Sequence, residues 1–377
     1  MMRKKLVIVS HTNHHMDVSG VVKGWGATIN EINYLADYWE EVVHVACLHE
    51  GTMPASSLPY IKPNIKFVAI PPYGGKTLAS KLGILLRIPK IIQQVVRHQQ
   101  GATEVQLRLP TSMGLFLLPL FSFFLPRKYT LWIKYAGNWN QQAPPLSYRL
   151  QRWWLQKNLA KSAVTLNGFW PHQAAHCYSF ENPCLTIADV GKGGLIAAGK
   201  DFSGPFDLVF IGRLEDAKGV SRIIAALQSI PTEKINQMHF IGDGPKTEHY
   251  KKEAAFLGSK ALFHGFLDKE QVHALLEKAH FFLLPSDSEG FPKVIAEAAC
   301  YGVIPIVSNV GSIPHYINPS NGFVWDLTGD RPYNEVLMET LTISNRILKE
   351  KSAHVLEVAK LFTFENYYFK LSLLIDS

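Results

Sequence analysis

Apolar residues along this chain fall into two kinds of segment that alternate with each other. Short runs rich in Val, Ile, Leu and Phe predict strands, and stretches with apolar residues three or four positions apart predict helices. The predicted strands are residues 6–10, 42–48, 66–70, 105–109, 130–135 and 163–166, then 208–211, 238–241, 262–264, 281–284 and 304–307. The predicted helices include residues 28–39, 221–228, 247–257, 269–279 and 292–301. This alternation predicts an α/β fold with parallel, doubly wound sheets.

The length of the chain divides this pattern into two domains, because 377 residues are too many for one ordinary hydrophobic core. The glycine-rich segment Val190–Gly194, with Gly199 and Gly204 after it, predicts a linker. The first domain is therefore expected to span residues 1–190 and the second to begin at residue 191. Two such domains would face a central cleft with the carboxyl ends of their sheets, where doubly wound folds bind ligands.

Composition and charge narrow the classes of protein. Hydrophobic residues make up 47% of the chain and charged residues 18%, which excludes a disordered protein. The four cysteines form no C-x-x-C pair and no disulfide framework, which favours a reducing, cytoplasmic setting. The longest apolar run, 115–125, is too short to span a bilayer, and the run at 6–9 is too short for a signal peptide. We expect a cytoplasmic protein without a transmembrane segment.

The charge is unevenly distributed between the two halves. Residues 1–190 carry 19 Lys and Arg against 9 Asp and Glu, a net of +10, whereas the remainder carries 19 against 22, a net of −3. A basic first half suggests that this half meets an anionic surface or ligand. Solvation alone explains the same charge equally well.

The first chemical motif follows the predicted strand at 208–211. Gly212 ends the strand, and a residue without a side chain lets the backbone approach a ligand. Arg213 follows at once, and Lys218 stands where the next helix begins. Two cations beside a helix N-terminus suit a diphosphate, because the helix end adds a partial positive charge. Taken alone, Arg213 and Lys218 would be interpreted as exposed side chains on an ordinary loop.

The second motif follows the predicted strand at 281–284. Glu289 and Gly290 precede Pro292, a residue suited to the first position of a helix, and Glu297 lies inside that helix. Eight helical residues span roughly 12 Å, close to the length of a nucleotide-sugar. Carboxylates accept hydrogen bonds from paired hydroxyls, so Glu297 is placed at a ribose and Glu289 at a sugar. The alternative is that Glu289 only interacts with the dipole of the helix and that Glu297 is solvated.

These two motifs, in their order and spacing, resemble the retaining glycosyltransferases of family 4, also called group 1. The resemblance rests on G-R-L-x-x-x-K-G at 212–219 and E-x7-E at 289–297. The further matching segments are Ile241–Pro245, His264–Leu267, Gly302–Val307 and Gly311–Pro314. The match is close over residues 206–325 and holds only in outline over the first half.

The resemblance implies a GT-B fold, with an acceptor domain at 1–190, a nucleotide-sugar domain at 191–361 and a terminal helix at 362–377 that crosses back to the first domain. It implies a hexosyltransferase of the retaining kind that uses no cofactor and no metal, because Arg213 and Lys218 would neutralise the departing diphosphate. Glu289 would contact the transferred sugar. The implied nucleotide-sugar residues are Gly26, Gly212, Gly242, Gly244, Phe266, Leu267, Gly290, Phe291, Lys293 and Glu297.

The first half departs from the family pattern. Gly26, at the start of the helix at 28–39, is the candidate for touching the phosphates from the opposite side. The His that many relatives carry near the donor sugar is missing from Tyr135–Asn140. Arg108 and Asn138 are the candidates for an acceptor site, and Arg108 alternatively pairs with a carboxylate. The group His11, His14 and His15 is interpreted as a surface loop, with a position facing the cleft as the alternative, and it is a weak metal signal.

The resemblance also implies partners: a donor, with UDP-sugar favoured over GDP-sugar, and a glycan or lipid-linked acceptor from polysaccharide or glycolipid synthesis. No nucleic acid is expected. The segment Tyr148–Lys157 mixes Trp153 and Trp154 with cations, which suits docking at an anionic inner membrane face. The alternative is that these tryptophans are buried.

Three other functions remain as alternatives. A sugar-nucleotide epimerase or a phosphorylase would share the GT-B fold but lack this pairing of motifs. A non-catalytic sugar- or membrane-binding module has no need for Glu289, Arg213 and Lys218 together. A nicotinamide-dependent oxidoreductase needs G-x-G-x-x-G directly after the first strand, whereas Gly20 and Gly24 come ten or more residues after Ser10.

Overall fold

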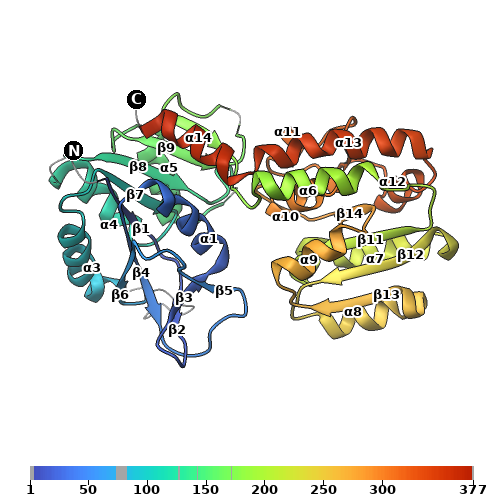
Figure 1. Ribbon diagram of the computed structural model, residues 1–377, viewed down its shortest axis with the longest axis horizontal. Helices are drawn as coiled ribbons and strands as arrows, with labels where there is room; N and C mark the ends of the chain where they lie inside the picture. Colours follow the sequence, from blue (N-terminus) through green and yellow to red (C-terminus); the bar gives the residue numbers. More distant parts are fainter. Residues whose placement is uncertain (1–3, 74–82, 126–127, 142, 171, 376–377) are drawn as a thin grey trace. The chain divides into compact units, whose positions relative to one another are not determined.

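The structure is a computed structural model that describes residues 4–73, 83–125, 128–141, 143–170 and 172–375. It divides into two compact units (Figure 1). Unit 1 consists of Met1–Phe180 together with Tyr368–Ser377, and unit 2 consists of Glu181–Tyr367. The chain therefore passes from one unit to the other twice, and the last helix, α14 (Phe364–Ile375), begins in unit 2 and ends in unit 1.

Unit 1 is built on one mixed sheet with the order β10-β9-β8-β7-β1-β4-β2-β3-β5, and β6 also pairs with β4. Its central strands β1, β4, β6, β7, β8 and β9 run parallel, while the short β3 pairs antiparallel with β2 and β5. The strands are β1 Lys5–Val9, β2 His14–Met16, β3 Val22–Trp25, β4 Glu41–His49, β5 Ser57–Pro59, β6 Ile65–Ile70, β7 Glu104–Leu109, β8 Thr130–Tyr135, β9 Ala163–Asn167 and β10 Cys177–Phe180.

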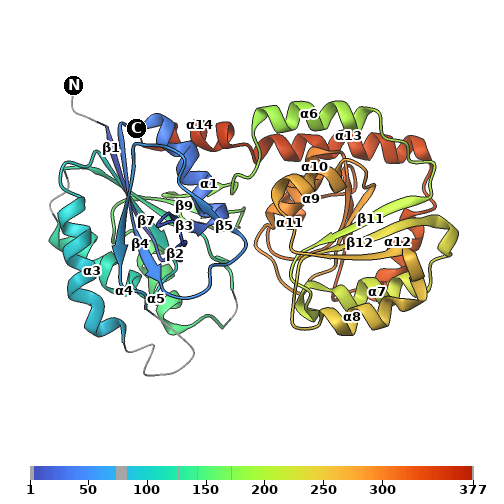
Figure 2. The same cartoon turned by 60° about the horizontal axis from the view of Figure 1, so that its bottom comes forward.

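Helices cover both faces of this sheet, as Figure 2 shows. One face carries α1 (Gly26–Leu35) and the end of α14, where the ring of Tyr38, in the 3-10 turn that follows α1, stacks on the ring of Tyr368. The other face carries α3 Ile84–His98, α4 Gly114–Pro119 and α5 Leu146–Gln156, with the single π-helical turn η2 (Leu120–Phe124) directly after α4.

Unit 2 is a parallel six-stranded sheet with the order β13-β12-β11-β14-β15-β16. The strands are β11 Phe206–Ile211, β12 Ile235–Ile241, β13 Ala261–Gly265, β14 Phe281–Leu284, β15 Ile304–Ser308 and β16 Phe323–Trp325. Counted along the unit this is the order 3-2-1-4-5-6 of a doubly wound nucleotide-binding sheet, which reverses between β11 and β14. Ligands of such sheets bind at the carboxyl ends of the strands beside that reversal.

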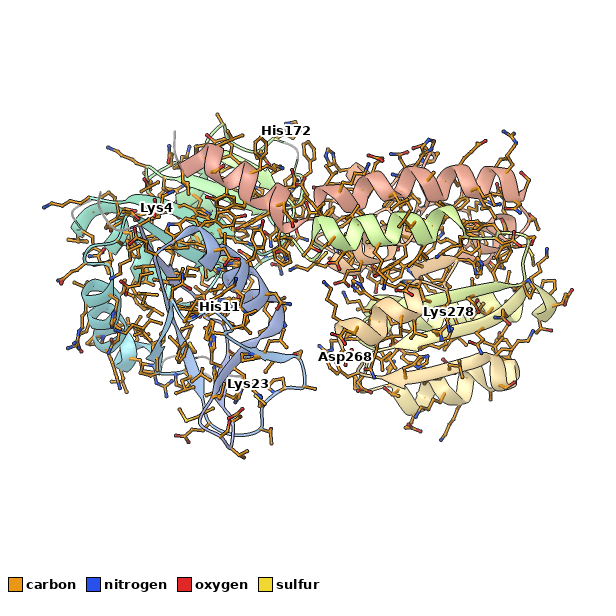
Figure 3. All side chains as sticks on the ribbon, viewed as in Figure 1. Lys4, His11, Lys23, His172, Asp268 and Lys278 are labelled. Atoms are coloured by element: carbon orange, nitrogen blue, oxygen red, sulfur yellow. The ribbon has the colours of Figure 1, made fainter. Side chains whose placement is uncertain are left out.

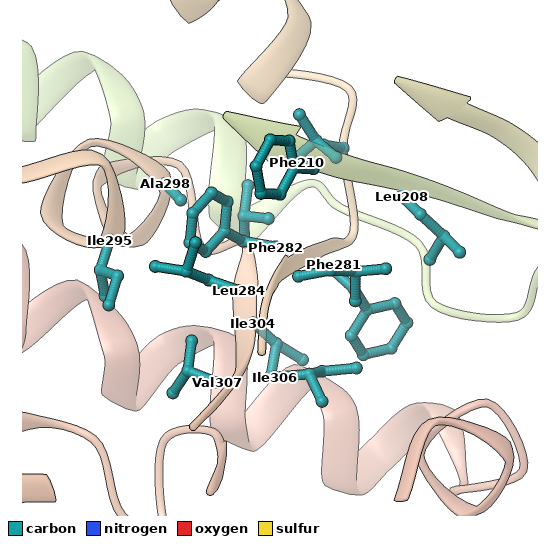
Figure 4. Packing of buried hydrophobic residues seen from close by; sticks show 14 of the residues in the cluster. Leu208, Phe210, Phe281, Phe282, Leu284, Ile295, Ala298, Ile304, Ile306 and Val307 are labelled. Atoms are coloured by element: carbon teal, nitrogen blue, oxygen red, sulfur yellow. The ribbon is translucent and has the colours of Figure 1, made fainter. Parts of the chain in front are cut away.

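Two groups of helices cover the faces of the unit 2 sheet (Figure 2). One group is α6 Ile187–Ala198, α9 Lys269–Leu276, α10 Lys293–Cys300 and α13 Asn345–Leu361, and the other is α7 Val220–Gln228, α8 Thr247–Glu253 and α12 Tyr333–Thr340. The short helix α11 (Ile313–Tyr316) follows β15. Because both faces are covered, central strands such as Phe281–Leu284 are apolar throughout and buried (Figure 4).

The predicted strands and helices are present, with ends that differ by a few residues. The strands that the sequence did not predict, β2, β3, β5, β10 and β16, have three or four residues each, too few for a period to be recognised. The predicted linker is wrong, because residues 190–194 lie inside α6. Thr186 and Asp189 form a capping box that begins this helix, and the pattern T-x-x-D was the signal for it. Within the described part of the chain, every helix is too short or too polar to cross a lipid bilayer.

Candidate functional site

Loops at the carboxyl edge of the unit 2 sheet pack against one another through their backbones. The loop after β11 meets the loop after β14 at Gly219, where a Cβ atom would stand 2.1 Å from the Pro285 carbonyl oxygen. The loop after β15 meets the same segment at Gly311, where a Cβ would stand 1.9 Å from the Glu289 carbonyl oxygen. Both glycines also have positive φ. These contacts hold residues 213–219 and 285–290 side by side.

The predicted glycines Gly242 and Gly244 fix the loop after β12 against the first loop. A Cβ on Gly242 would stand 2.1 Å from the Gly212 carbonyl oxygen, and one on Gly244 would stand 2.1 Å from the Leu214 carbonyl oxygen. The structure thus gives these glycines a packing role.

Lys218 and Glu289 meet where the loop after β11 contacts the loop after β14. The Lys218 Nζ atom donates to a carboxylate oxygen of Glu289 at 2.6 Å. The Lys218 side chain is 27% exposed and that of Glu289 is 9% exposed. The carboxylate is therefore nearly buried at the edge of the sheet, whereas the Lys218 side chain is partly accessible to solvent. The two residues are 71 positions apart in the sequence, and the topology of the sheet brings them together.

Arg213 stands at the same edge but outside the pair. Its side chain is 69% exposed, and its guanidinium lies 3.5 Å from the carboxylate of Glu215. Such a side chain can turn towards a ligand at little cost, because it gives up only a weak exposed contact. Lys218 is therefore the positioned cation of the predicted pair, and Arg213 is the adaptable one.

Glu297 lies half-buried on α10, inside the helix where the sequence placed it. Burial raises the pKa of its carboxyl group, and the nearby charges of Lys269 and Lys293 partly oppose that change. Among the described residues, no hydrogen bond or ion pair reaches this carboxylate. A half-buried carboxylate without such a partner is costly to keep, and a ligand that offers hydroxyl groups would satisfy it.

The segment after β13 is oriented by a side chain that the sequence interpretation left unassigned. The Asp243 carboxylate accepts from the Phe266 backbone N–H at 3.2 Å, and the Gly242 N–H donates to the Gly265 carbonyl at 2.8 Å. The Phe266 side chain is half exposed, whereas Leu267 packs on the core. The backbone of this segment, which contains the predicted nucleotide-sugar residues Phe266 and Leu267, is thus held by the loop after β12.

Three further predicted residues, Gly290, Phe291 and Lys293, lie at the end of the loop after β14 and at the first residue of α10. The Gly290 carbonyl accepts from both the Ser312 N–H and the Ser312 hydroxyl, at 2.9 and 3.0 Å. The Phe291 ring stacks on Phe362, with ring centres 4.5 Å apart, and so belongs to the core. The Lys293 ammonium donates to the Pro183 carbonyl at 2.8 Å. In this structure the side chains of Phe291 and Lys293 therefore serve the fold.

The predicted residues of unit 1 are largely occupied by internal contacts. The Gly26 N–H donates to the Ser56 carbonyl at 2.9 Å, and a Cβ here would stand 2.6 Å from that oxygen. Arg108 is buried and pairs with Glu31 at 2.9 Å, which is the alternative that the sequence left open for it. Asn138 is half-buried in the loop after β8, where its side chain accepts from the Asn140 N–H at 2.9 Å.

The interpretation of the three histidines as a surface loop is wrong for two of them. His14 and His15 are buried in β2, because that strand pairs with both β3 and β4. His11, labelled in Figure 3, is exposed in the loop after β1. Over the described residues there is no group of three or more His, Cys, Asp or Glu that could hold a metal ion.

The sequence of this chain is similar to known proteins over its second half. Residues 196–352 match the family model described as glycosyl transferases group 1. A glycogen synthase of Mycobacterium tuberculosis is 34% identical over 142 residues, which are 35% of this chain and 34% of that protein. The chain thus covers about a third of the length of this curated relative.

Solved structures match over nearly the whole length. Sucrose-phosphate synthase from Thermosynechococcus elongatus has a TM-score of 0.69 at 17% identity and covers 99% of this chain and 98% of its own. Anabaena Alr3699/HepE in complex with UDP-glucose has a TM-score of 0.65 at 15% identity and covers 99% of both chains. The predicted fold is confirmed: the chain has the GT-B architecture of two Rossmann-like domains.

Proposed function

We propose that this protein is a glycosyltransferase that moves a sugar from a nucleotide-diphosphate sugar to a glycan or lipid-linked acceptor. The observation that carries the proposal is the arrangement at the edge of unit 2, where a positioned ammonium, Lys218, meets a carboxylate, Glu289, and the helix that follows this loop, α10, carries the unsatisfied carboxylate of Glu297. The match of residues 196–352 to group 1 glycosyl transferases supports it.

In the proposed reaction, the acceptor hydroxyl oxygen bonds to the anomeric carbon as the bond from that carbon to the diphosphate oxygen breaks. Lys218 and Arg213 stabilise the negative charge that develops on the leaving diphosphate. Glu289 accepts from hydroxyls of the transferred sugar, and Glu297 accepts from the ribose. The acceptor proton passes to the departing phosphate, which lies on the face of the sugar that the acceptor attacks, and the configuration is retained.

A release assay tests the donor and the reaction together. Purified protein is screened with UDP- and GDP-sugars by thermal shift, since a ligand of the native state raises the melting temperature. The donor that gives the largest shift then enters an assay for free nucleoside diphosphate. We propose a UDP-sugar, because HepE, of the same fold, binds UDP-glucose. Binding without release of diphosphate would favour the non-catalytic module instead.

Two further measurements define the chemistry. Release is expected to persist in excess EDTA, because Lys218 and Arg213 supply the positive charge that a metal ion would otherwise supply. A loss that magnesium or manganese restores would contradict this role. The anomeric configuration of the product, read from its proton coupling constant, separates retention from inversion.

An exposed apolar patch on unit 1 supports a membrane-proximal acceptor. Phe123 and Phe124 on η2 are 64% and 74% exposed, and Trp153 on α5 is 48% exposed. Trp154 is instead packed against the core, and its indole N–H donates to the Ser122 hydroxyl at 3.1 Å. Of the two tryptophans, Trp153 is therefore exposed and Trp154 is packed inside unit 1. The basic composition of the first half is a second argument for this docking, because it suits an anionic lipid surface at the cytoplasmic face.

Co-sedimentation with vesicles tests this docking. The protein is expected to bind vesicles that contain phosphatidylglycerol more than neutral ones, and less at high salt, because screening shortens the attraction to roughly 8 Å at physiological ionic strength. Phe123→Ser together with Phe124→Ser should weaken the binding. Phe369→Ser, which removes an equally exposed ring from α14, is the matched control. Equal, negligible binding to both vesicle types would indicate a soluble acceptor.

A further inference from the structure

The loop that carries Glu289 has no regular structure, so its position depends on contacts with its neighbours. The Asp287 N–H donates to the Ala217 carbonyl at 2.9 Å, and Ser312 holds the Gly290 carbonyl from the other side. The loop also receives a side chain from α7, at Pro285 and Asp287. That side chain is Arg222, which the sequence interpretation did not single out.

Arg222 makes two contacts with the loop. Its Nη1 atom donates to the Pro285 carbonyl at 3.0 Å, and its Nη2 atom pairs with an Asp287 carboxylate oxygen at 2.7 Å. The guanidinium also lies 5.7 Å from the centre of the Trp325 ring, on the last strand of the sheet. A planar fork can serve a carbonyl, a carboxylate and a ring face at once, and a lysine ammonium cannot.

The place of Arg222 in its helix is locally unfavourable. It is the third residue of α7, where the positive end of the helix dipole repels a cation. A charge kept against a local preference is expected where the tertiary structure or the function requires it. Here the same helix begins two residues after Lys218, so Arg222 joins the segment that carries Lys218 to the loop that carries Glu289.

We infer that Arg222 is a positioning residue for the donor sugar. It holds the loop of residues 285–290 so that the Glu289 carboxylate contacts Lys218 and can accept hydrogen bonds from the sugar. The inference rests on the proposed function. Because Glu289 is assigned to the sugar and Glu297 to the ribose, displacing this loop should affect recognition of the sugar more than recognition of the nucleotide.

The test compares Arg222→Ala with Arg346→Ala, which removes an arginine from an exposed pair on α13. A misplacement of about 1 Å lowers rates by up to about 100-fold, so kcat/KM of Arg222→Ala should fall 10- to 100-fold. Its affinity for UDP should change less than threefold, while its affinity for the UDP-sugar that the thermal-shift screen selects falls about tenfold. Arg222→Lys should lie between wild type and Arg222→Ala, since it can keep one of the two contacts.

Coupling to Asp287 sharpens the test. If Arg222 acts through this loop, adding Asp287→Ala to Arg222→Ala should cost much less than Asp287→Ala costs alone. Unchanged kinetics in Arg222→Ala would overturn the inference. A parallel loss of UDP and UDP-sugar affinity, together with a lower melting temperature, would overturn it as well, because that pattern indicates general damage to the unit.

Hydrogen–deuterium exchange separates this inference from the proposed function. Amides of residues 286–290, above all that of Asp287, should exchange faster in Arg222→Ala than in Arg346→Ala, whether or not a sugar is transferred. If wild type binds no nucleotide-sugar and releases no diphosphate, the proposed function fails. In that case faster exchange still supports the positioning of the loop, and unchanged exchange overturns it.

Discussion

The two units use polar side chains in opposite ways. In unit 1, Glu31 accepts from Arg108 at 2.9 Å and from Lys134 at 2.6 Å, and all three side chains are less than 10% exposed. In unit 2, Lys218 is partly exposed and Arg213 is exposed at the edge of the sheet, and Glu297, on α10, lacks a hydrogen-bond or ion-pair partner among the described residues.

A second group in unit 1 shows the same internal satisfaction. The His14 Nδ1 atom donates to the Thr12 carbonyl at 2.9 Å, which leaves its Nε2 to accept from the Tyr60 hydroxyl at 2.8 Å. The His44 Nδ1 atom also lies 2.7 Å from the Tyr60 hydroxyl oxygen, and its Nε2 atom lies 2.7 Å from the Ser10 hydroxyl oxygen. The polar groups of unit 1 thus satisfy one another, whereas the proposed function assigns those of unit 2 to a ligand. Substitutions in each group test whether the two units differ in this way.

The largest expected effect is on the stability of unit 1. Glu31→Gln leaves the Arg108 and Lys134 cations buried without their carboxylate, and breaking such a buried pair costs about 3–5 kcal/mol. Urea unfolding measures the loss. Glu350→Gln, from an exposed pair, should stay within about 0.5 kcal/mol of wild type. Nucleotide binding by the folded variant should be unchanged, and a Glu31→Gln protein as stable as wild type would contradict the role given to this cluster.

Lys218→Ala should have the next largest effect, and on turnover. Losing one preorganised charge at the leaving group costs about 100-fold in rate, or about 2.7 kcal/mol. The rate of nucleoside diphosphate release measures it, with Lys360→Ala from an exposed pair as the control. Arg213→Ala is expected to lose about as much activity without a change in melting temperature. Near-normal release by either variant would remove the diphosphate assignment.

Tyr60→Phe tests the histidine network at a smaller scale. The substitution removes one hydroxyl and leaves the His14 Nε2 and His44 Nδ1 atoms without it, which should cost about 1–3 kcal/mol of stability. Thermal unfolding compares it with Tyr178→Phe, a change on an exposed ring of the same unit. If both variants unfold at the temperature of wild type, the network does not stabilise unit 1.

Glu297→Gln should have the smallest effect and the opposite sign on stability. Burial raises the pKa of this carboxyl above its value of 4.5 in an unfolded chain, so its contribution to stability is present below pH 4.5 and lost as the pH rises through the folded-state pKa. At pH 7 the variant should therefore be at least as stable as wild type, and the two should converge near pH 4. Its donor affinity should fall about tenfold, because hydrogen bonds to a charged acceptor are lost. Calorimetry at several pH values checks both expectations, and a variant less stable than wild type at pH 7 would show that the carboxylate has a partner.

The interpretation of the sequence was most accurate where local pattern and tertiary structure agree. The apolar runs of unit 2 predicted its central strands because a strand buried on both faces is apolar throughout. The glycines of the site were visible for a similar reason, since positions such as Gly219 exclude any side chain. The linker prediction was wrong because it relied on glycine content, whereas the capping box formed by Thr186 and Asp189 begins a helix, α6, at this place.

By itself, the sequence determined the alternation of strands and helices, the glycine turns and the identity of the charged residues, because these depend on local preferences and on periodicity. Only the tertiary structure decided which charges meet. Lys218 and Glu289, 71 residues apart, form a pair because β11 and β14 are neighbours at the reversal of the sheet. Arg108 became a buried partner of Glu31, and Glu297 was left without such a partner among the described residues, because burial and pairing depend on which elements pack together.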